Sequence, residues 1–377
     1  MRMKQFFWIF GLFIFSQTVF AFPLKWSLHS VDEVKTQILN PVVRVDENQS
    51  PWVVFREESE NKKYYGVSVI TRDDKTKKWI YDAKLLSGIE VVSGPSFAMN
   101  ASKVKLIGVI HQGRYLEGRF WIQKQRGKWQ PLPPSPVKGI DHIDVALSSS
   151  GIPYFVSSHS KTKGKLSVYR LNTQKNLWVR VGDLSSMIGT QSSSLSKIKI
   201  EPSGRTVVAF QTLKGLKVVR YDAEKDIWRR VGPGGTPAVG QGSSSILDFD
   251  LWIFSNFHYL VAFTDQLRGS RTYVIESKDN STWNQVGSHF VSKNVTLSPR
   301  IVIFNGKVVI SVHENRHMKV YTLKKNQWEI ATDSVQSPSP VGIGFLSISG
   351  DSNGTALWGA YQDNGNEDRL SLVELVE

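Results

Sequence analysis

The sequence predicts an all-β fold, a seven-bladed β-propeller of four-stranded antiparallel blades, from a recurring tryptophan and a recurring order of strands. Six tryptophans stand 45 to 55 residues apart, several followed by Val-Gly as in "LWVRVGD" and "IWRRVGP": Trp79, Trp129, Trp178, Trp228, Trp283 and Trp328. Polar turns and short runs rich in β-branched and aromatic residues fill the intervals, without helical periodicity. A four-stranded repeat of about 50 residues is typical of a propeller blade.

Each repeat has the same predicted order of strands. The innermost strand comes first, as in "VVRVD", "HIDVAL" and "SKIKIE", and an apolar second strand follows, as in "WVVF" and "VVAF". After a third, alternating strand, the tryptophan begins the outermost strand. We expect its ring to pack between neighbouring blades, because an aromatic residue at a fixed place in every repeat is first a packing residue. The Val-Gly is expected to end this strand and turn the chain inward.

The two ends of the chain complement each other. The C-terminal segment supplies three strands, "GIGFLSIS", "TALWGAYQ" and "DRLSLVELVE", while "LKWSLHS" near the N-terminus is a tryptophan strand without a blade. We expect residues 23–30 to pair with residues 368–376, which would close the ring and remove its open edges. A six-bladed ring, with one repeat as a loop excursion, is the alternative.

Residues 1–21 are predicted to be a secretory signal peptide, and residues 22–377 to form the propeller as a single domain. Arg2 and Lys4 precede an apolar run, and Val19 and Ala21 stand where a signal peptidase reads. An uncleaved membrane anchor is the alternative.

The chain has no cysteine, which excludes disulfides. We expect a secreted or periplasmic monomer without a membrane span after cleavage.

The repeat W-x-x-V-G, with the turn and strand before it, resembles the Trp-rich secreted β-propellers of the broad sialidase-like kind, over essentially the whole chain after residue 21. Residues 277–283, "SKDNSTW", are an imperfect echo of the sialidase Asp-box. A sialidase-like enzyme would imply three arginines that grip a carboxylate, a Tyr–Glu nucleophile pair and an acidic general acid. The spacing does not fix three arginines on predicted strands as such a triad: Arg44, Arg56 and Arg300.

Five aspartates lie on or beside predicted innermost strands: Asp46, Asp141, Asp144, Asp248 and Asp250. A glycosidase needs two carboxylates that face each other across a cleft, and these residues are candidates for the pair. We favour the alternative that they line a solvent-filled central channel. The chain has no nucleophile-elbow, zinc-protease or P-loop motif, and its eight histidines lack metal-ligand spacing. We therefore predict no catalytic residue, metal or cofactor; a quinone-dependent dehydrogenase would need ligands that we do not find.

The predicted ligand-binding residues follow the apolar run of each second strand: Arg56, His111, His159, Gln211, Asp265, His313 and Asp363. In propellers the loop after this strand lies on the face that usually carries the binding site, so we expect these groups to form one ring around the channel mouth. The alternative is that strand ends are polar because loops are solvated. In that case the site is expected in the inter-blade loops at residues 183–195 and 232–245.

Net charge supplies the last indication. The formal net charge is +14, and two of the cations lie in the signal segment. Because a positive surface favours polyanions, acidic glycans and lipopolysaccharide are candidate partners. Nucleic acid is not expected, since base-stacking and arginine-rich motifs are missing. We predict an exported, non-enzymatic binding or scaffold propeller for a glycan, polyanion or protein; the alternative is a glycoside hydrolase of sialidase-like architecture.

Overall fold

A computed structural model describes residues 25–29, 31–59, 63–86, 90–159, 165–188, 195–212, 215–232, 245–332, 343–351 and 353–376. The predicted signal peptide lies outside the described residues, as do residues 189–194 and 233–244 of the two inter-blade loops. Among the helices in the described ranges, none has both the length and the apolar character needed to cross a membrane.

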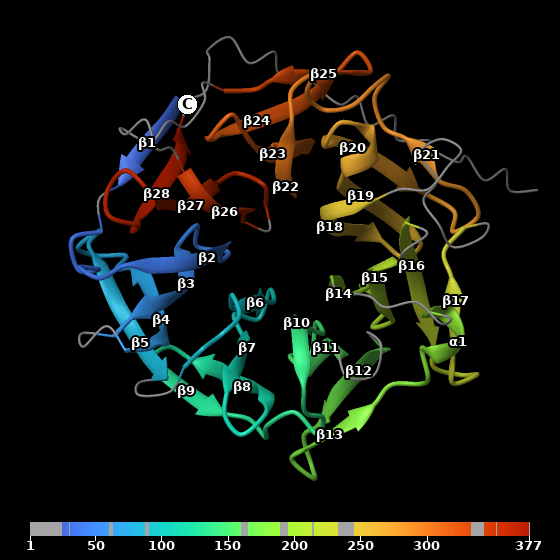
Figure 1. The fold of residues 1–377 in the computed structure, drawn as a ribbon, viewed down its shortest axis with the longest axis horizontal. Coiled ribbons are helices and arrows are strands. Elements are labelled where there is room, and N and C mark those ends of the chain that lie inside the picture. Colours follow the sequence, from blue (N-terminus) through green and yellow to red (C-terminus); the bar gives the residue numbers. More distant parts are fainter. Residues whose placement is uncertain are drawn as a thin grey trace, which may run out of the picture.

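The described chain forms seven four-stranded antiparallel sheets arranged in a ring (Figure 1), which confirms seven blades rather than six. Blade 1 contains β2 (Ile38–Val45), β3 (Pro51–Glu58), β4 (Tyr65–Arg72) and β5 (Trp79–Leu86). Blade 2 contains β6 (Ser96–Met99), β7 (Lys105–Gln112), β8 (Leu116–Gln125) and β9 (Lys128–Pro131). Blade 3 contains β10 (Ile140–Leu147), β11 (Pro153–His159), β12 (Lys165–Asn172) and β13 (Leu177–Arg180).

The remaining blades repeat this order. Blade 4 contains β14 (Ser196–Ile200), β15 (Thr206–Thr212), β16 (Gly215–Asp222) and β17 (Ile227–Arg230). Blade 5 contains β18 (Ile246–Ser255), β19 (His258–Asp265), β20 (Arg271–Ser277) and β21 (Asn284–Gln285). Blade 6 contains β22 (Thr296–Phe304), β23 (Lys307–Glu314), β24 (His317–Lys324) and β25 (Gln327–Ile330). Blade 7 combines β26 (Ile343–Gly350), β27 (Leu357–Asp363) and β28 (Arg369–Val376) with β1 (Lys25–His29). A short helix, α1 (Ser185–Ile188), and a 3₁₀ turn, η3 (Gln266–Arg268), complete the elements.

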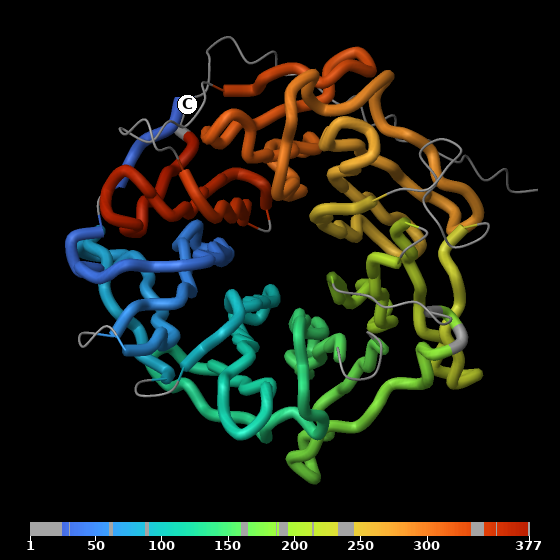
Figure 2. The backbone as a smooth tube through the Cα atoms, in the orientation of Figure 1, coloured from blue at the N-terminus to red at the C-terminus, as the bar shows by residue number. Residues whose placement is uncertain are grey.

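The first strand joins the last blade, as the sequence predicts. Strands β1 and β28 pair antiparallel, with Lys25 opposite Val376 and His29 opposite Leu372. The indole N–H of Trp26 also donates to Thr332 Oγ1 at 2.9 Å, which ties β1 to the chain that follows blade 6. Figure 2 shows the backbone passing around the ring in sequence order, so that its blue and red ends meet in one blade.

The hydrophobic core lies between neighbouring sheets. One cluster joins Val156 and Val168 of blade 3 to Val208, Phe210 and Trp228 of blade 4, all of them buried. Burial of each such side chain stabilises the fold by ~1.5–3 kcal/mol. Because every blade must present apolar side chains to both of its neighbours, the second and third strands are strongly apolar, which is the pattern that the sequence repeats.

The recurring W-x-x-V-G motif joins blades 3 to 4, 4 to 5 and 5 to 6. The indole N–H of Trp228 donates to the carbonyl oxygen of Val181 at 3.1 Å, and Trp283 bonds Val231 in the same way at 2.9 Å. The glycine after Val181, Gly182, has a φ of 55°, and a Cβ there would lie 2.9 Å from Trp228 Nε1. The valine therefore presents a carbonyl to the next tryptophan, and the glycine leaves room for its ring.

Candidate functional site

All seven innermost strands contribute to the wall of a central cavity of about 770 Å³. This volume lies within the range of about 300–1,000 Å³ that is usual for ligand pockets. The wall follows from strand geometry, because alternate side chains of a strand point to opposite faces. In β14, Lys197 and Lys199 line the cavity, while Ile198 between them is fully buried in the core between blades 3 and 4.

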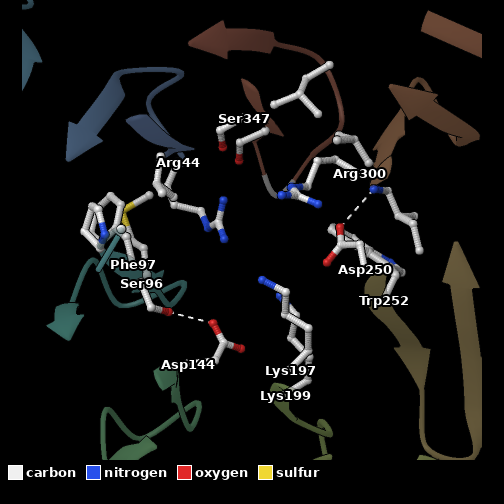
Figure 3. A pocket seen from close by; sticks show the side chains of 18 of the residues that line it. Arg44, Ser96, Phe97, Asp144, Lys197, Lys199, Asp250, Trp252, Arg300 and Ser347 are labelled. Atoms are coloured by element: carbon white, nitrogen blue, oxygen red, sulfur yellow. Dashed lines mark hydrogen bonds between the residues drawn. The ribbon is translucent and has the colours of Figure 1, made fainter. Parts of the chain in front are cut away.

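Charged side chains of both signs line the cavity wall on the innermost strands. They come from five of the blades: Arg44, Asp144, Lys197, Lys199, Asp248, Asp250 and Arg300. Figure 3 shows the cationic ends of Arg44, Lys197, Lys199 and Arg300 pointing into one shared space, with Asp144 and Asp250 at its edge. These side chains are half-buried, since protein surrounds them but the cavity admits solvent.

Two of the carboxylates connect neighbouring blades. Asp144 of β10 accepts a hydrogen bond from the backbone N–H of Ile198 in β14 at 2.9 Å, and Asp250 of β18 accepts one from Ile301 in β22, also at 2.9 Å. The other oxygen of Asp144 accepts from Ser96 Oγ at 2.6 Å. These aspartates therefore help to hold the innermost strands together around the cavity.

Asp248 pairs with Arg300. Their ion pair is 3.0 Å long, and the second oxygen of Asp248 accepts from the N–H of Phe249 at 2.8 Å. Burial opposes the charge of Arg300, but Asp248 and Asp250 outweigh it and raise the pKa of Arg300. Burial would likewise raise the pKa of Asp250, but Lys199 and Arg300 hold that pKa below its usual value. Both groups are therefore charged at neutral pH.

The other three cations have no such partner. Among the described residues, no carboxylate lies within ion-pairing distance of Arg44, Lys197 or Lys199. Arg44 Nη1 donates to the carbonyl oxygen of Val43 at 2.8 Å. Burial lowers the pKa of Lys199 and of Arg44, although Asp250 and Asp144 partly compensate. The cavity thus holds cations that could still bind an anion.

Apolar and aromatic side chains complete the lining. Phe345 is 51% exposed and Leu297 is 39% exposed, although both are large apolar residues. Trp252 of β18 lines the cavity as well, partly buried against the core between blades 5 and 6. In the described part of the chain, no group of three or more His, Cys, Asp or Glu side chains is arranged to hold a metal ion. The cavity therefore offers charge and apolar surface to an organic ligand.

The predicted ring residues lie within the last three positions of the second strands, one strand further from the axis than the cavity wall. None of these seven is among the cavity-lining residues: Arg56, His111, His159, Gln211, Asp265, His313 and Asp363. In blade 6, for example, Leu297 of β22 lines the cavity, and His313 of β23 is its strand partner. The first strand separates the ring from the cavity.

Most of the ring side chains contact their own blade or its loops. Asp265 Oδ1 accepts from the N–H groups of Ser245 and Leu267 at 3.2 and 3.1 Å. The guanidinium of Arg56 lies over the Tyr65 ring, 4.8 Å from its centroid. His111 and His159 are 6% exposed and Asp363 is 2% exposed, so little of each reaches solvent. Participation of the ring in binding stays a prediction.

Sequence reasoning named much of the cavity wall but missed two of its cations. Four of the five aspartates proposed as channel lining do line it, namely Asp46, Asp144, Asp248 and Asp250, and so do Arg44 and Arg300. Asp141 and Arg56 do not. Lys197 and Lys199 were overlooked, although the alternation in "SKIKIE" on a predicted innermost strand was a sufficient signal.

Comparison with known proteins supports the fold and leaves the function open. No protein-family model and no curated protein matches the chain. The SapL1 lectin, solved with alpha methyl fucoside, is 12% identical, with 80% of this chain and 99% of the lectin aligned and a TM-score of 0.52. An alpha-L-arabinanase of Penicillium chrysogenum, complexed with arabinobiose, is 11% identical over 94% of this chain and 98% of the enzyme, with a TM-score of 0.53.

A third similar structure is the alpha-L-arabinofuranosidase of Fusarium graminearum in complex with an iminosugar inhibitor. It is 11% identical over 94% of this chain and 98% of the enzyme, with a TM-score of 0.52. At such identities the likeness concerns the fold alone, and the seven blades follow from the strand order of this chain. The structural neighbours include both a lectin and glycoside-cleaving enzymes.

Proposed function

We propose that the protein is an exported, non-enzymatic propeller that binds a glycan in its central cavity. The observation that carries the proposal is the cavity itself, which combines exposed aromatic surface at Phe345 with polar groups converging from several blades. Polar groups that converge on one concave site beside apolar and aromatic surface are typical of ligand pockets. The lectin solved with a fucoside and the two enzymes, one complexed with arabinobiose and one with an iminosugar inhibitor, support a sugar as the ligand. The predicted signal peptide supports export.

The state of the cavity carboxylates favours binding over hydrolysis. Each oxygen of Asp144, Asp248 and Asp250 already accepts a hydrogen bond from the protein. A glycosidase needs a general acid whose pKa is raised, so that it keeps its proton at neutral pH. The cations around Asp250 instead lower its pKa. Asp250 is therefore poorly suited to donate a proton to a leaving group.

Glycoside hydrolysis is the second candidate, because Asp144 and Asp250 face the same cavity (Figure 3). One experiment distinguishes glycan binding from glycoside hydrolysis. Residues 22–377 are applied to a glycan array, and the glycans that bind are incubated with the protein and assayed for new reducing ends. We expect binding without cleavage. New reducing ends that disappear in Asp144→Asn or Asp250→Asn would support hydrolysis instead.

A matched pair of variants locates the site. Phe345→Ala removes an exposed aromatic ring of the cavity, whereas Ile330→Ala removes an equally apolar side chain, 58% exposed, from the outer strand β25. We expect Phe345→Ala to weaken binding at least tenfold and Ile330→Ala to leave it unchanged. Equal binding by both variants would place the site outside the cavity.

A further inference from the structure

Three cations of the cavity lining have no carboxylate of a described residue within ion-pairing distance. Arg44 comes from blade 1, and Lys197 and Lys199 come from blade 4, yet all three point into the same space (Figure 3). Arg300 approaches from blade 6 and is already paired with Asp248. Strands distant in the sequence thus bring three unpaired cations together around one small volume.

This arrangement is unfavourable for the empty protein. Burial disfavours the charged forms of Arg44 and Lys199, and Arg44 and Lys197 both add repulsion at Lys199. Asp250 and Asp144 offset part of it, but they also accept backbone N–H groups of the following blade. An anion placed among the three cations would remove the repulsion and replace lost hydration with charge-assisted hydrogen bonds.

The remaining acidic residues of the lining do not supply that anion. Asp46 Oδ1 accepts from the N–H groups of Asn48 and Ser50 in its own turn, at 2.9 and 3.0 Å. Asp351 accepts from backbone N–H groups of the turn after β26. Glu47 is an exposed residue next to Asp46. These three lie in the turns that leave the innermost strands, and two of them are bonded to their own turns.

We propose that the ligand is an acidic glycan, whose carboxylate or sulfate binds among Arg44, Lys197 and Lys199. The inference rests on the proposed function and deepens it, since it names the class of glycan. An arginine supplies two parallel donors to a planar carboxylate or to two sulfate oxygens, and the lysines act as point charges. Phe345 and Trp252, which also line the cavity, supply apolar surface for the sugar ring.

The test compares acidic probes with their neutral counterparts. Binding to residues 22–377 is measured by isothermal titration, at low salt, for a uronic-acid oligosaccharide and its carboxyl-reduced form, and for a sulfated oligosaccharide and its desulfated form. Free glucuronate and inorganic sulfate are titrated alongside. We expect at least tenfold tighter binding of an acidic form than of its neutral counterpart. The preferred pair distinguishes a carboxylate from a sulfate.

Lysine variants show whether the cavity is responsible. Lys199→Gln removes a cavity cation, and Lys225→Gln removes an exposed cation of the same blade, so both change the net charge equally. We expect Lys199→Gln to weaken binding of the acidic probe at least tenfold, Lys199→Arg to restore most of it, and Lys225→Gln to have no effect. Because Lys199→Gln removes an unpaired, half-buried charge, the melting temperature should stay at or above that of the parent.

The outcomes separate this inference from the proposed function. In one outcome a neutral glycan binds, Phe345→Ala abolishes that binding, and the acidic forms bind no more tightly. The proposed function then stands, and the inference of an acidic ligand is wrong. If glucuronate or sulfate binds in a Lys199-dependent way while no glycan binds, the anion site stands and glycan recognition fails. Equal loss of binding in Lys199→Gln and Lys225→Gln would show that binding depends on surface charge and not on the cavity, which would overturn the inference. Failure of every acidic probe to bind would overturn it as well.

Discussion

Trp228 of blade 4 and Val181, which follows blade 3, are joined by a hydrogen bond of 3.1 Å from the indole N–H to the valine carbonyl oxygen. Trp228 is 2% exposed and packs beside Tyr221, whose ring centroid is 5.2 Å away. The same bond recurs between the next two pairs of blades, from Trp283 to Val231 and from Trp328 to Val286. The tryptophans are therefore packing residues of the ring.

Replacing Trp228 by alanine is expected to destabilise the protein by ~3–5 kcal/mol, because it removes buried area, leaves a cavity and frees a buried carbonyl group. Urea unfolding of the two proteins measures the difference. Trp228 is not among the residues lining the central cavity, so ligand affinity of the folded variant should equal that of the parent. Weakened binding at unchanged stability would mean that Trp228 contacts the ligand.

The glycine of the Val-Gly pair can be tested against a matched glycine. Gly287 has a φ of 82°, and a Cβ there would lie 2.6 Å from Trp328 Nε1, whereas Gly204 has a φ of 84° and nothing within 4 Å of its Cβ position. Both alanine variants bear the ~1–2 kcal/mol of left-handed strain. We expect Gly287→Ala to lower the free energy of unfolding further than Gly204→Ala does. Equal losses would show that the contact with the tryptophan is unimportant.

Closure of the ring predicts the effect of removing β1. Deletion of residues 22–30 exposes the edge of β28, whose partner residues run from Leu372 to Val376. An unpaired edge strand invites association with another chain. The deleted protein should melt at a lower temperature and form aggregates in size-exclusion chromatography. A truncated protein as stable and monodisperse as the parent would contradict the role of β1 in closure.

The lowered pKa of Glu314 predicts that part of the stability of the folded protein is lost in acid. Burial opposes its charge, but hydrogen bonds from Lys319, Ser292 and Tyr321 lower the pKa of Glu314 from 4.5 to about 2. The carboxylate is thus stabilised in the folded state, by up to about 3 kcal/mol above pH 5, and this contribution is lost as the pH falls toward 2. Glu314→Gln should unfold more easily at pH 7 and show a shallower loss of stability on acidification.

A surface glutamate provides the control for this titration. Glu329 is half exposed in β25 and lies 3.5 Å from Lys324, a surface ion pair that contributes little. Glu329→Gln should change the free energy of unfolding by less than about 1 kcal/mol at any pH. If Glu314→Gln behaves like Glu329→Gln in chemical unfolding from pH 7 to pH 3, the buried carboxylate has no special stabilising role.

The double variant His111→Ala with His313→Ala distinguishes the ring of second-strand residues from the central cavity. Because neither histidine lines the cavity, we expect the affinity for a cavity ligand to remain that of the parent. Burial, together with His317, lowers the pKa of His313. The imidazole of His313 therefore stays neutral to a lower pH than that of a free histidine. Weaker binding by the folded double variant would place the ligand at the second-strand ends.

The fold was predictable because its packing is repeated. A tryptophan begins the outer strand once per repeat, so Trp178, Trp228 and Trp283 mark the period directly, and each donates its indole N–H to a carbonyl of the segment before its blade. A glycine leaves room for the ring at Trp228, Trp283 and Trp328. The closing strand was predictable as well, since Trp26 has the same place in an isolated strand. These features depend on local sequence and on one repeated interface.

The site was less predictable because it depends on distance from the axis. His313 and Leu297 are strand partners, yet only Leu297 lines the cavity. The residues at the end of an apolar run do not show whether their strand borders the cavity or lies one strand further out. Lys197 and Lys199 look like solvated surface lysines in isolation. Their proximity to Arg44 arises only when blades 1 and 4 face each other across the ring (Figure 1).

The most direct test of the central claim is a crystal structure of residues 22–377 with the acidic oligosaccharide that binds most tightly. Recognition of an acidic glycan in the central cavity predicts ligand density between Lys199 and Arg44, with an acidic oxygen within hydrogen-bonding distance of both and a sugar ring against Phe345. Ligand density at the second-strand ends near His313, or on the outer strands, with an empty cavity would contradict the account.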